Sequence, residues 1–473
     1  MRVEALRGLE GVRAVAAGLE GRTAWLVGGV VRDALIGREL GDVDVAVAGD
    51  AEAAARSVGR MLRGPVFPLS QKFGGWRAID GNRRFRCDVS PLQGDSIDAD
   101  LARRDFTVNA IALPITVGAP IDPHDGLGDI DRRVLRVLGP EAYADDPLRA
   151  LRLMRLSAEL GFEPDAETER LTAAIVPRLT EPSAERVFVE LRRTIAAPGA
   201  VASLELGRRT GVLATVLPEL TALEGVEQSR FHHRDVYGHT LEVLSHAIEI
   251  AADPAAIFGD LGPQVASVLA EPLADGLTRG EALRLGALFH DVAKPATRGE
   301  RSGGGVSFVG HDSAGDEMVG AIFRRMHTSE RLRSYVGKLT RQHLVLGFLV
   351  HEAPLSGRAV HGYLRRCEPV EVEVTVLSCA DRLATRGEGQ QQWIAKHLAL
   401  ARDVMEPALH WRLRGPPRPP LRGDELGSAL GIAPGPEVGK LLCELEAAVY
   451  AGEVDGRDEA LELVRRVHED GGR

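Results

Sequence analysis

The sequence lacks the features of several common protein classes. Only four of its 473 residues are cysteine, and no CxxC pair occurs, which argues against a disulfide scaffold or a cysteine zinc site. The N-terminus has no apolar signal-peptide core, and no apolar run approaches the ~20 residues of a membrane-spanning helix. We therefore expect a cytoplasmic protein with no membrane partner.

Basic charge and aromatic side chains are also scarce. Acidic residues outnumber basic ones by 68 to 58, and aromatic residues make up 4% of the chain. A basic balance is the usual footprint of a nucleic-acid-binding domain, and stacking on bases needs aromatic rings. A local basic patch can still hold a phosphate backbone, so the composition disfavours nucleic-acid binding without excluding it.

The residues that are present predict several domains. A chain of 473 residues exceeds one ordinary hydrophobic core. The first ~135 residues are expected to form a small α/β unit, with short strand-like runs at 24–27, 43–47, 77–79 and 85–89. Beyond that unit the pattern is almost entirely helical. A proline-rich stretch at 414–423 predicts a stiff linker before a small helical tail.

A glycine pair at the end of the first strand-like run predicts an anion site. The predicted strand ends at Gly28-Gly29, and a helix begins at about Val30. Glycine lets a phosphate approach the backbone closely, and a helix N-terminus offers free N–H groups and a positive dipole. Arg32 on the first turn adds positive charge there. A plain strand–helix turn with a surface arginine is the alternative interpretation.

Two aspartates follow on one face of the next predicted strand. Asp42 and Asp44 are two positions apart, and alternate residues of a strand point to the same face. Two adjacent carboxylates repel each other unless a cation neutralises them, and Mg²⁺ prefers such oxygen ligands. The pair alone leaves two interpretations open, a magnesium site and an acidic strand edge that faces solvent.

Polar residues recur every three positions further along the chain. Asp146, Arg149, Arg152 and Arg155 are predicted to lie along one side of a helix. They could form a solvated ladder of ion pairs. Alternatively, aspartate accepts a hydrogen bond from a base amino group and arginine donates to ring nitrogen or carbonyl, so that the two imitate a base-pairing edge.

The rare histidines cluster with aspartates in the second half of the chain. The candidates are His239, the pair His290-Asp291, His311, His343 and Asp381. A lone histidine on a helix is more often a packed residue than a ligand. Separated histidine and aspartate residues, each in a helical context, fit metal ligation better.

The string LVGGVVRDALIGRELGDVDVAVAG at 26–49 is very similar to the signature of class II tRNA nucleotidyltransferases and bacterial poly(A) polymerases. Four further stretches match that family in the same order: DLARRDFTVNAIAL at 100–113, IDPHDGLGDIDRRVLR at 121–136, DDPLRALRLMRLSAELGF at 145–162 and SAERVFVEL at 183–191. The resemblance implies an α+β fold, with a head like that of DNA polymerase beta, built on a small mixed β-sheet, followed by an all-helical neck, body and tail.

The resemblance also assigns roles to residues of the head and neck. Gly29 and Arg32 would hold the nucleotide triphosphate, with Asp33 as the partner of Arg32, and Asp42 and Asp44 would bind catalytic Mg²⁺. The residues expected to contact the nucleotide are Arg104, Asp146, Arg149, Arg152 and Arg155, with Asp146 and Arg149 as the amino-acid template for CTP and ATP. Asp88 is a candidate third carboxylate beside the Asp42 and Asp44 pair.

The histidine-rich region resembles an HD phosphohydrolase domain. The expected mononuclear ligand set is His239, His290, Asp291 and Asp381, and His311 and His343 could complete a second metal site. A divalent transition metal is expected there. Domains with a full ligand set hydrolyse phosphoesters, so phosphohydrolase activity is a function of another class that the chain could carry.

Together these resemblances predict a head at 1–137, a neck at 138–225, an HD body at 226–400 and a tail at 405–473. The expected reaction is attack of a tRNA 3′-hydroxyl on CTP or ATP, which adds or repairs the terminal CCA and releases pyrophosphate. The expected partners are tRNA, CTP and ATP, with no DNA.

One departure from the family bears on the product. Only SPLQGDSIDA, residues 90–99, separates the fourth strand-like run from Asp100. Many CCA-adding members have a much longer flexible loop there, which assists the switch from CTP to ATP, and the shortened form resembles that of enzymes adding only CC. A CC-only enzyme and a poly(A) polymerase therefore remain alternatives.

Overall fold

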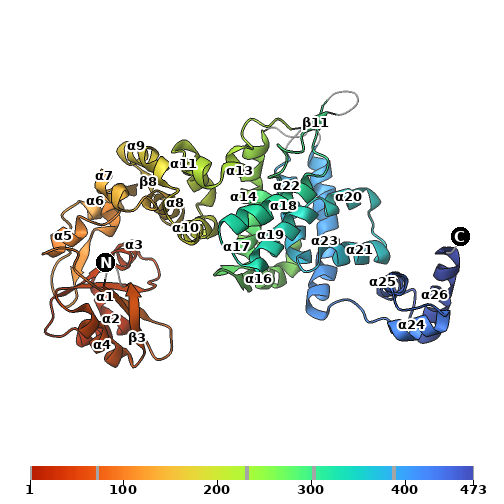
Figure 1. Ribbon diagram of the computed structural model, residues 1–473, viewed down its shortest axis with the longest axis horizontal. Helices are drawn as coiled ribbons and strands as arrows, with labels where there is room; N and C mark the ends of the chain where they lie inside the picture. Colours follow the sequence, from red (N-terminus) through yellow and green to blue (C-terminus); the bar gives the residue numbers. More distant parts are fainter. Residues whose placement is uncertain (1–2, 71–73, 229–233, 301–304, 386–389, 472–473) are drawn as a thin grey trace. The chain divides into compact units, whose positions relative to one another are not determined.

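The computed structural model describes residues 3–70, 74–228, 234–300, 305–385 and 390–471, and the chain divides into two compact units, Met1–Val216 and Leu217–Arg473 (Figure 1). The predicted head lies in the first unit, and the predicted HD body and tail lie in the second. The boundary between the units falls inside the predicted neck, and the four-domain division remains a prediction.

The first unit begins with a six-stranded mixed sheet. Its strands are β1 Ala24–Val27, β2 Val43–Val47, β3 Val66–Ser70, β4 Gly75–Ile79, β5 Arg86–Pro91 and β6 Ala112–Pro114. The spatial order is β3-β4-β5-β2-β1-β6, and β2 and β5 are parallel while all other neighbours are antiparallel. This arrangement confirms the small mixed sheet that was predicted for the head.

Helices lie on both faces of this sheet. The helices of this part of the chain are α1 Val3–Gly8, α2 Glu10–Gly18, α3 Gly29–Ile36, α4 Ala51–Leu62, α5 Ile97–Leu101, η1 Thr107–Asn109 and α6 Gly126–Arg132. Helix α4 packs on β4 and β5. Ala46 of β2 is buried with Leu101 of α5 in a cluster on the other side. Both faces of the strand predicted at 43–47 are therefore largely covered, although its alternating valines would suit a strand with one exposed face.

The remainder of the first unit is helical. Its elements are α7 Pro140–Asp145, α8 Arg149–Leu160, α9 Ala166–Ile175, η2 Val176–Arg178, α10 Ala184–Ala196, α11 Ala200–Arg209 and α12 Val212–Val216, with β7 Val134–Leu135 paired to β8 Glu163–Pro164.

The prediction that Asp146 shares the helix of the arginines is wrong. Asp146 has extended backbone (φ −152°, ψ 99°), because the ring of Pro147 disfavours helical geometry in the residue before it.

Long and short helices together form the body of the second unit. They are α13 Pro218–Thr221, α14 Val236–Ala252, α15 Ala255–Phe258, η3 Gly259–Leu261, α16 Gly262–Ala270, α17 Arg279–Phe289, α18 His311–Arg325, α19 Glu330–Gln342, α20 Val345–Leu349, η4 Val350–Glu352, α21 Gly357–Cys367, α22 Glu371–Leu383 and α23 Gln390–Arg414. Two small hairpins pair β9 Pro272–Ala274 with β10 Leu277–Thr278, and β11 Gly299–Glu300 with β12 Val306–Ser307. Helix α17 packs against α14, α19 and α22.

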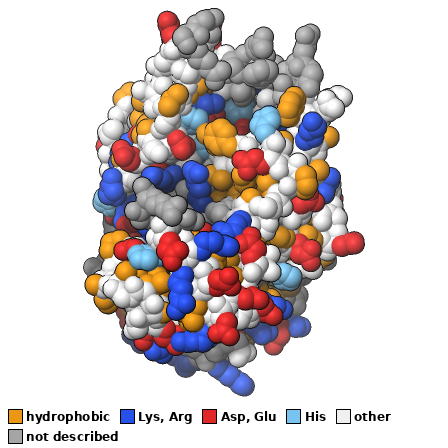
Figure 2. All heavy atoms as spheres, turned by 90° about the vertical axis from the view of Figure 1, so that its right-hand side faces the viewer, with side chains coloured by type: hydrophobic (Ala, Val, Ile, Leu, Met, Phe, Trp, Pro, Cys, Tyr) orange, Lys and Arg blue, Asp and Glu red, His pale blue; other side chains and the backbone are white. Residues whose placement is uncertain are grey.

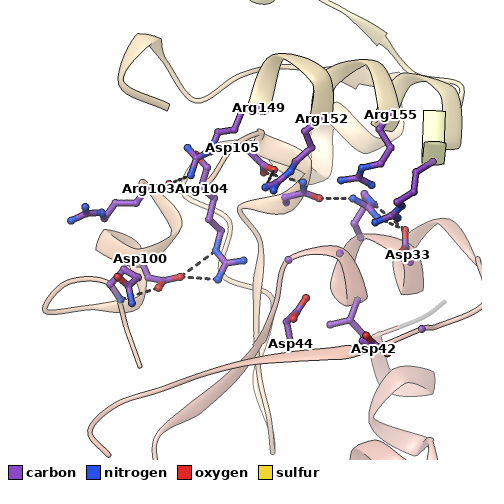
Figure 3. A pocket seen from close by; sticks show the side chains of 18 residues that line it. Asp33, Asp42, Asp44, Asp100, Arg103, Arg104, Asp105, Arg149, Arg152 and Arg155 are labelled. Carbon is purple, nitrogen blue, oxygen red and sulfur yellow. Dashed lines mark hydrogen bonds and ion pairs between the residues drawn. The ribbon is translucent and has the colours of Figure 1, made fainter. Parts of the chain in front are cut away.

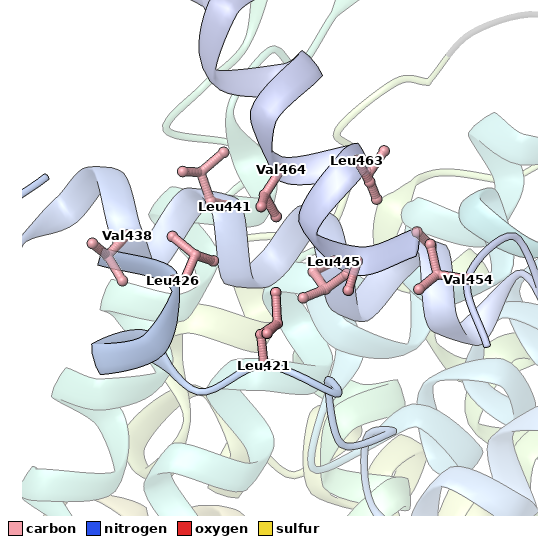
Figure 4. Close-up of a cluster of buried hydrophobic side chains, with 10 residues drawn as sticks. Leu421, Leu426, Val438, Leu441, Leu445, Val454, Leu463 and Val464 are labelled. Atoms are coloured by element: carbon pink, nitrogen blue, oxygen red, sulfur yellow. The ribbon is translucent and has the colours of Figure 1, made fainter. Parts of the chain in front are cut away.

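The chain ends in a separate small core. Helices α24 Gly423–Leu430, α25 Pro436–Tyr450 and α26 Arg457–Gly471 bury a cluster that includes Leu426, Leu441, Leu445 and Val464 (Figure 4). The helical tail after residue 423 was predicted from the sequence. The tail docks on α21 of the body, where His361 Nε2 lies 2.9 Å from Glu446 Oε1.

The surface carries charges of both signs. On the face that Figure 2 shows, basic side chains lie among acidic ones. Within the described part of the chain, no helix has the length and apolar character needed to cross a membrane.

Candidate active site

A cavity of about 550 Å³ in the first unit collects most of the residues that the sequence singled out. Its lining includes Gly29, Arg32, Asp42, Asp44, Arg104, Arg149, Arg152 and Arg155. In Figure 3 the three arginines of α8 point into the cavity from one side, and Asp42 and Asp44 lie on the other. Asp88 and Asp146 are not among the residues that line it.

The glycine turn sets the wall of this cavity. Gly28 has a φ of +72° at the start of α3, a conformation that side-chain-bearing residues rarely adopt. A Cβ on Gly28 would lie 3.0 Å from Arg104 Nη1 and 3.7 Å from Asp44 Oδ2. The absence of a side chain at Gly28 therefore lets Arg104 lie directly against the turn, close to Asp44.

Arg32 is held from two sides. Its Nε donates to Asp33 Oδ1 at 2.9 Å, and its Nη1 donates to Asn109 Oδ1 at 2.6 Å. The first contact is the predicted partnership with Asp33. A buried guanidinium fixed in this way offers positive charge at the N-terminal turn of α3, where anions are favoured.

The two aspartates differ in environment. Asp42 precedes β2 and has a side chain 42% exposed. Burial raises the pKa of Asp44 to about 6, and the neighbouring Asp88 and Asp42 carboxylates add to the effect while Arg104 and Arg77 oppose it. A buried carboxyl beside other carboxylates is stabilised in its charged form by a cation. The donor set of Asp42 and Asp44 therefore fits Mg²⁺, which takes oxygen ligands.

Asp88 lies next to Asp44 but faces an arginine. The two residues are partners in the register of parallel strands β2 and β5. Both carboxylate oxygens of Asp88 accept hydrogen bonds from Arg77, at 2.7 Å from Nε and 2.7 Å from Nη2. The predicted third carboxylate thus lies beside the pair with a protein cation already bound.

The arginines of α8 are anchored rather than solvated. Arg149 donates to the backbone carbonyls of Arg104 at 2.9 Å and Ala142 at 3.1 Å. Arg155 is buried, and its Nε donates to Glu190 Oε2 at 2.6 Å. These contacts disfavour the alternative of a solvated ion-pair ladder, because none of the three arginines pairs with Asp146 in the described contacts.

Sequence reasoning missed a polar chain that links Arg32 to α8. Asn109 accepts from Arg32 and donates through Nδ2 to Asp105 Oδ1 at 2.9 Å, and Arg152 Nη1 donates to Asp105 Oδ2 at 3.0 Å. Burial acts to raise the pKa of Asp105, but Arg152 and Asn109 outweigh it and hold the pKa at about 2. Both residues stand in the quoted motif at 100–113, which was the available signal.

Asp100 fixes Arg104 and the short connection before α5. Arg104 Nη2 donates to Asp100 Oδ2 at 2.9 Å, and the backbone N–H of Gln93 donates to Asp100 Oδ1 at 3.0 Å. Asp100 is itself buried. One carboxylate therefore orients a cavity arginine and ties down the segment between β5 and α5.

Asp146 is engaged outside the cavity. Its Oδ2 accepts a hydrogen bond at 2.7 Å from Nη2 of Arg186 on α10. The structure therefore brings Arg149, but not Asp146, to the cavity wall.

The second unit gathers the six predicted metal ligands. His239 comes from α14, His290 and Asp291 follow α17, His311 begins α18, His343 follows α19 and Asp381 lies in α22. Potential ligand atoms form two groups within 4.8 Å: His239, His290 and Asp381, and then Asp291, His311 and His343. Asp291 joins them, since its Oδ2 lies 3.0 Å from His290 Nε2 and its Oδ1 lies 3.3 Å from His311 Nε2.

The histidine rings are oriented by the backbone. The Nδ1 atoms of His290, His311 and His343 lie 2.8, 2.7 and 2.6 Å from the carbonyl oxygens of Ala287, Phe308 and Thr340. An Nδ1–H that donates to a carbonyl leaves Nε2 as the lone-pair donor, as in metal-binding histidines. The donor set therefore fits a divalent transition metal.

Lys294 is a member of this cluster that the sequence analysis missed. Its Nζ lies 2.6 Å from Asp291 Oδ2. Burial acts to raise the pKa of Asp291, but the charges of His290 and Lys294 hold that pKa well below its usual range. The spacing of three positions between Asp291 and Lys294 was the available signal in the sequence, because residues three apart in a helical turn lie on the same face.

Comparison with known proteins now gives the family. Three family models match: the Poly A polymerase head domain over residues 24–136, the Probable RNA and SrmB-binding site of polymerase A over 161–224, and the HD domain over 236–386. The chain is 34% identical over 446 residues to the CC-adding tRNA nucleotidyltransferase of Thermus thermophilus, covering 93% of this chain and 92% of that protein. The chain belongs to the tRNA nucleotidyltransferase family.

Relatives of this nucleotidyltransferase differ in their named products. The A-adding tRNA nucleotidyltransferase of Deinococcus radiodurans is 33% identical, covering 94% of this chain and 95% of its own length. The Multifunctional CCA protein of Xanthomonas campestris is 32% identical, covering 86% and 96%. Membership of the family therefore gives the enzyme class, nucleotidyl transfer, and confirms that prediction.

Solved structures agree on the fold of the nucleotidyltransferase. A CCA-adding enzyme complexed with ATP aligns with a TM-score of 0.67 at 20% identity, over 99% of both chains. The Thermotoga maritima CCA-adding enzyme complexed with tRNA aligns with a TM-score of 0.63 at 20% identity, over 99% of this chain and 98% of that one. The predicted order of a mixed-sheet head followed by helical parts with an HD domain is thus confirmed.

Proposed function

We propose that this nucleotidyltransferase adds the two cytidines of the 3′-terminal CCA to tRNA, using CTP and releasing pyrophosphate. The observation that carries this proposal is the cavity itself, in which the glycine turn, Arg32, the pair Asp42 and Asp44, Arg104 and the arginines of α8 converge. Nucleotidyl transfer needs little covalent chemistry from the protein, so positioning and charge neutralisation are what such a cavity supplies.

Asp42 and Asp44 would hold catalytic Mg²⁺. When bound, Mg²⁺ activates the attacking hydroxyl and neutralises charge on the leaving phosphate. The raised pKa of Asp44 supports this assignment, since the carboxyl is buried beside other carboxylates and gains most from a bound cation.

The triphosphate would lie against the glycine turn. The backbone at Gly29 and the buried guanidinium of Arg32 offer donors at the N-terminus of α3. Arg104, oriented by Asp100, lines the same cavity beside the turn. These groups fix the α-phosphate in front of the tRNA 3′-hydroxyl.

Base selection would use the template pair Asp146 and Arg149. Arg149 already lines the cavity, and its anchoring to backbone carbonyls defines the direction of its remaining donors. Asp146 can accept from the amino group of cytosine after exchange of its hydrogen bond with Arg186. Arg152 and Arg155 would hold the nucleotide from the same helix.

The proposal that addition ends after the second cytidine is based on the connection between β5 and α5. Only residues 92–96 separate the two elements, and Asp100 binds the backbone of Gln93 within them. A segment this short and tied cannot move as the long flexible loop of many CCA-adding members does. A CC-adding relative is 34% identical and an A-adding relative is 33% identical, so the proposed product rests on this segment and not on the relatives.

The deciding experiment supplies purified enzyme with Mg²⁺ and tRNA transcripts that end before CCA, after C and after CC. With CTP and ATP together, we expect extension of the first two to CC and no addition to the third. Extension of all three transcripts to CCA would overturn the CC-only product and establish a full CCA enzyme. Addition of A to the third transcript alone would indicate an A-adding enzyme, and long A tails would indicate a poly(A) polymerase. An Asp42→Asn/Asp44→Asn variant serves as the inactive control.

A second function is favoured by the six-ligand cluster of the HD body. His239, His290, Asp291 and Asp381 would hold one divalent metal, and His311 and His343 would complete a second site with Asp291. A metal there supplies an activated water for phosphoester hydrolysis. Purified protein should contain a transition metal by elemental analysis and hydrolyse p-nitrophenyl phosphate. Equal metal content and hydrolysis in a His290→Ala/Asp291→Ala variant would exclude this role.

A further inference from the structure

Three charged side chains form a row across the head sheet. Arg77 on β4 is the register partner of Asp88 on β5, and Asp88 is the partner of Asp44 on β2. Neighbours in such a row point to the same face of a sheet. The row thus runs from Asp44 at the cavity, through Asp88, to Arg77 on the next strand.

Arg77 stands at the end of this row and forms an ion pair with Asp88. Its bidentate contact uses both oxygens of Asp88, at 2.7 Å each, in the geometry in which guanidinium and carboxylate bind most strongly. Its Nη2 also lies 3.7 Å from Asp42 Oδ2. The Asp88 side chain is 12% exposed and that of Arg77 is 24% exposed, so solvent screens this pair only in part.

We infer that Arg77 is a positioning residue of the nucleotidyltransferase, which holds Asp88 as its counter-ion and so limits the catalytic metal centre to Asp42 and Asp44. This inference rests on the proposed Mg²⁺ site. Asp88 therefore serves as the counter-ion of Arg77 and is not a metal ligand. Without the guanidinium, three carboxylates would face one another across β2 and β5, and the head would attract divalent cations more strongly.

The inference predicts opposite effects for the two partners. Arg77→Met frees Asp88 and is expected to tighten Mn²⁺ binding by about tenfold, because one positive charge leaves and one carboxylate becomes available. Asp88→Asn leaves the charge of Arg77 uncompensated beside Asp42 and is expected to weaken Mn²⁺ binding by about as much. The double variant should bind Mn²⁺ with nearly the affinity of the wild type.

The measurement is a Mn²⁺ titration of full-length protein by electron paramagnetic resonance, without nucleotide or RNA. Ions bound by the HD body are common to all variants, and they are identified with an Asp42→Asn/Asp44→Asn protein. Arg86 provides a matched control, since its Nη1 also lies 3.7 Å from Asp42 Oδ2, but its side chain is 50% exposed. Arg86→Met should change Mn²⁺ affinity by no more than about twofold, because exposed charges are screened.

Two outcomes would overturn the role of Arg77. If the double variant binds as weakly as Asp88→Asn, Asp88 is itself a metal ligand. If Arg77→Met leaves Mn²⁺ affinity unchanged, the ion pair is only structural. Arg77→Lys, which keeps the charge, should retain wild-type affinity and guards against misfolding. Unchanged Mn²⁺ binding in Asp42→Asn/Asp44→Asn would instead contradict the proposed metal site.

Discussion

Gly28 and Gly37 flank the two ends of α3, and alanine at each tests whether the cavity wall at Gly28 matters for catalysis. Both glycines have positive φ, +72° and +78°. A Cβ on Gly28 would meet Arg104 and approach Asp44, whereas a Cβ on Gly37 meets nothing within 4 Å. Gly37 has left-handed helical backbone (ψ 26°), where alanine should cost about 1 kcal/mol of stability, whereas Gly28 (ψ −138°) lies outside that region and alanine there should cost about 1–3 kcal/mol.

Only Gly28→Ala should also damage catalysis. We expect CMP addition to fall by about tenfold or more, because a 1 Å displacement of a catalytic group costs of that order or beyond. Gly37→Ala should retain activity within about twofold. The measurement is the single-turnover rate of CMP addition, with unfolding monitored in parallel. Equal losses of activity in the two variants would show that strain, and not the cavity wall, is responsible.

Glu371 gives a pH-dependent prediction away from both sites. Burial raises its pKa to about 7, and Glu373 adds to the shift while Arg412 and Arg279 oppose it. The folded state therefore holds the proton more tightly than the unfolded state does. The stability that protonation contributes is complete below about pH 4.5 and is lost as pH rises through 7.

Glu371→Gln should remove this dependence. Relative to the variant, the wild type is expected to lose about 1–2 kcal/mol of unfolding free energy between pH 5.5 and 8.5. Urea unfolding of both proteins at the two pH values measures this difference, in which other titrating groups cancel. A difference that does not change with pH would mean that Glu371 stays ionised in the folded body.

At the scale of elements, the proposed arrest after CC depends on the connection from β5 to α5. Insertion of about ten flexible residues after Gln93 would free this segment from its tie to Asp100. We expect such an enzyme to gain addition of the terminal A to a transcript ending in CC, while CMP addition persists. The assay compares ATP incorporation by the two proteins. An insertion variant that adds CC normally but never A would show that the stop lies elsewhere.

Elements also show where sequence reasoning reached its limit. The strands of the head and the start of α3 were predictable, because alternation, glycines and helix starts are local signals. The position of Asp146 was misjudged, although Pro147 beside it was the available local signal. Asp100, Asp105 and Asn109 were missed as site residues, because their importance comes from partners such as Arg152 that lie far along the chain.

At the scale of the molecule, the two candidate sites lie in different compact units. The cavity with Asp42 and Asp44 belongs to the first unit, and the cluster around Asp291 belongs to the second. Each unit supplies all the predicted ligands of its own site, so the two activities should separate by mutation.

We expect Asp42→Asn/Asp44→Asn to reduce CMP addition by about a hundredfold or more while phosphatase activity stays near wild type. His290→Ala/Asp291→Ala should give the reverse pattern. Both activities are measured on the same preparations of each variant, with circular dichroism to verify folding. Loss of CMP addition in the HD variant would mean that the second unit contributes to transfer.

The sequence by itself determined the enzyme family and the candidate residues, because five stretches match the family in the same order, although the glycine turn and the carboxylate pair each left a structural alternative open when taken alone. Only the tertiary structure decided which partner each candidate residue contacts. It paired Asp88 with Arg77, placed Asp146 against Arg186, and joined Arg32 to Arg152 through Asn109 and Asp105. Such pairings depend on strand register and helix packing, which bring together charges that no local pattern relates.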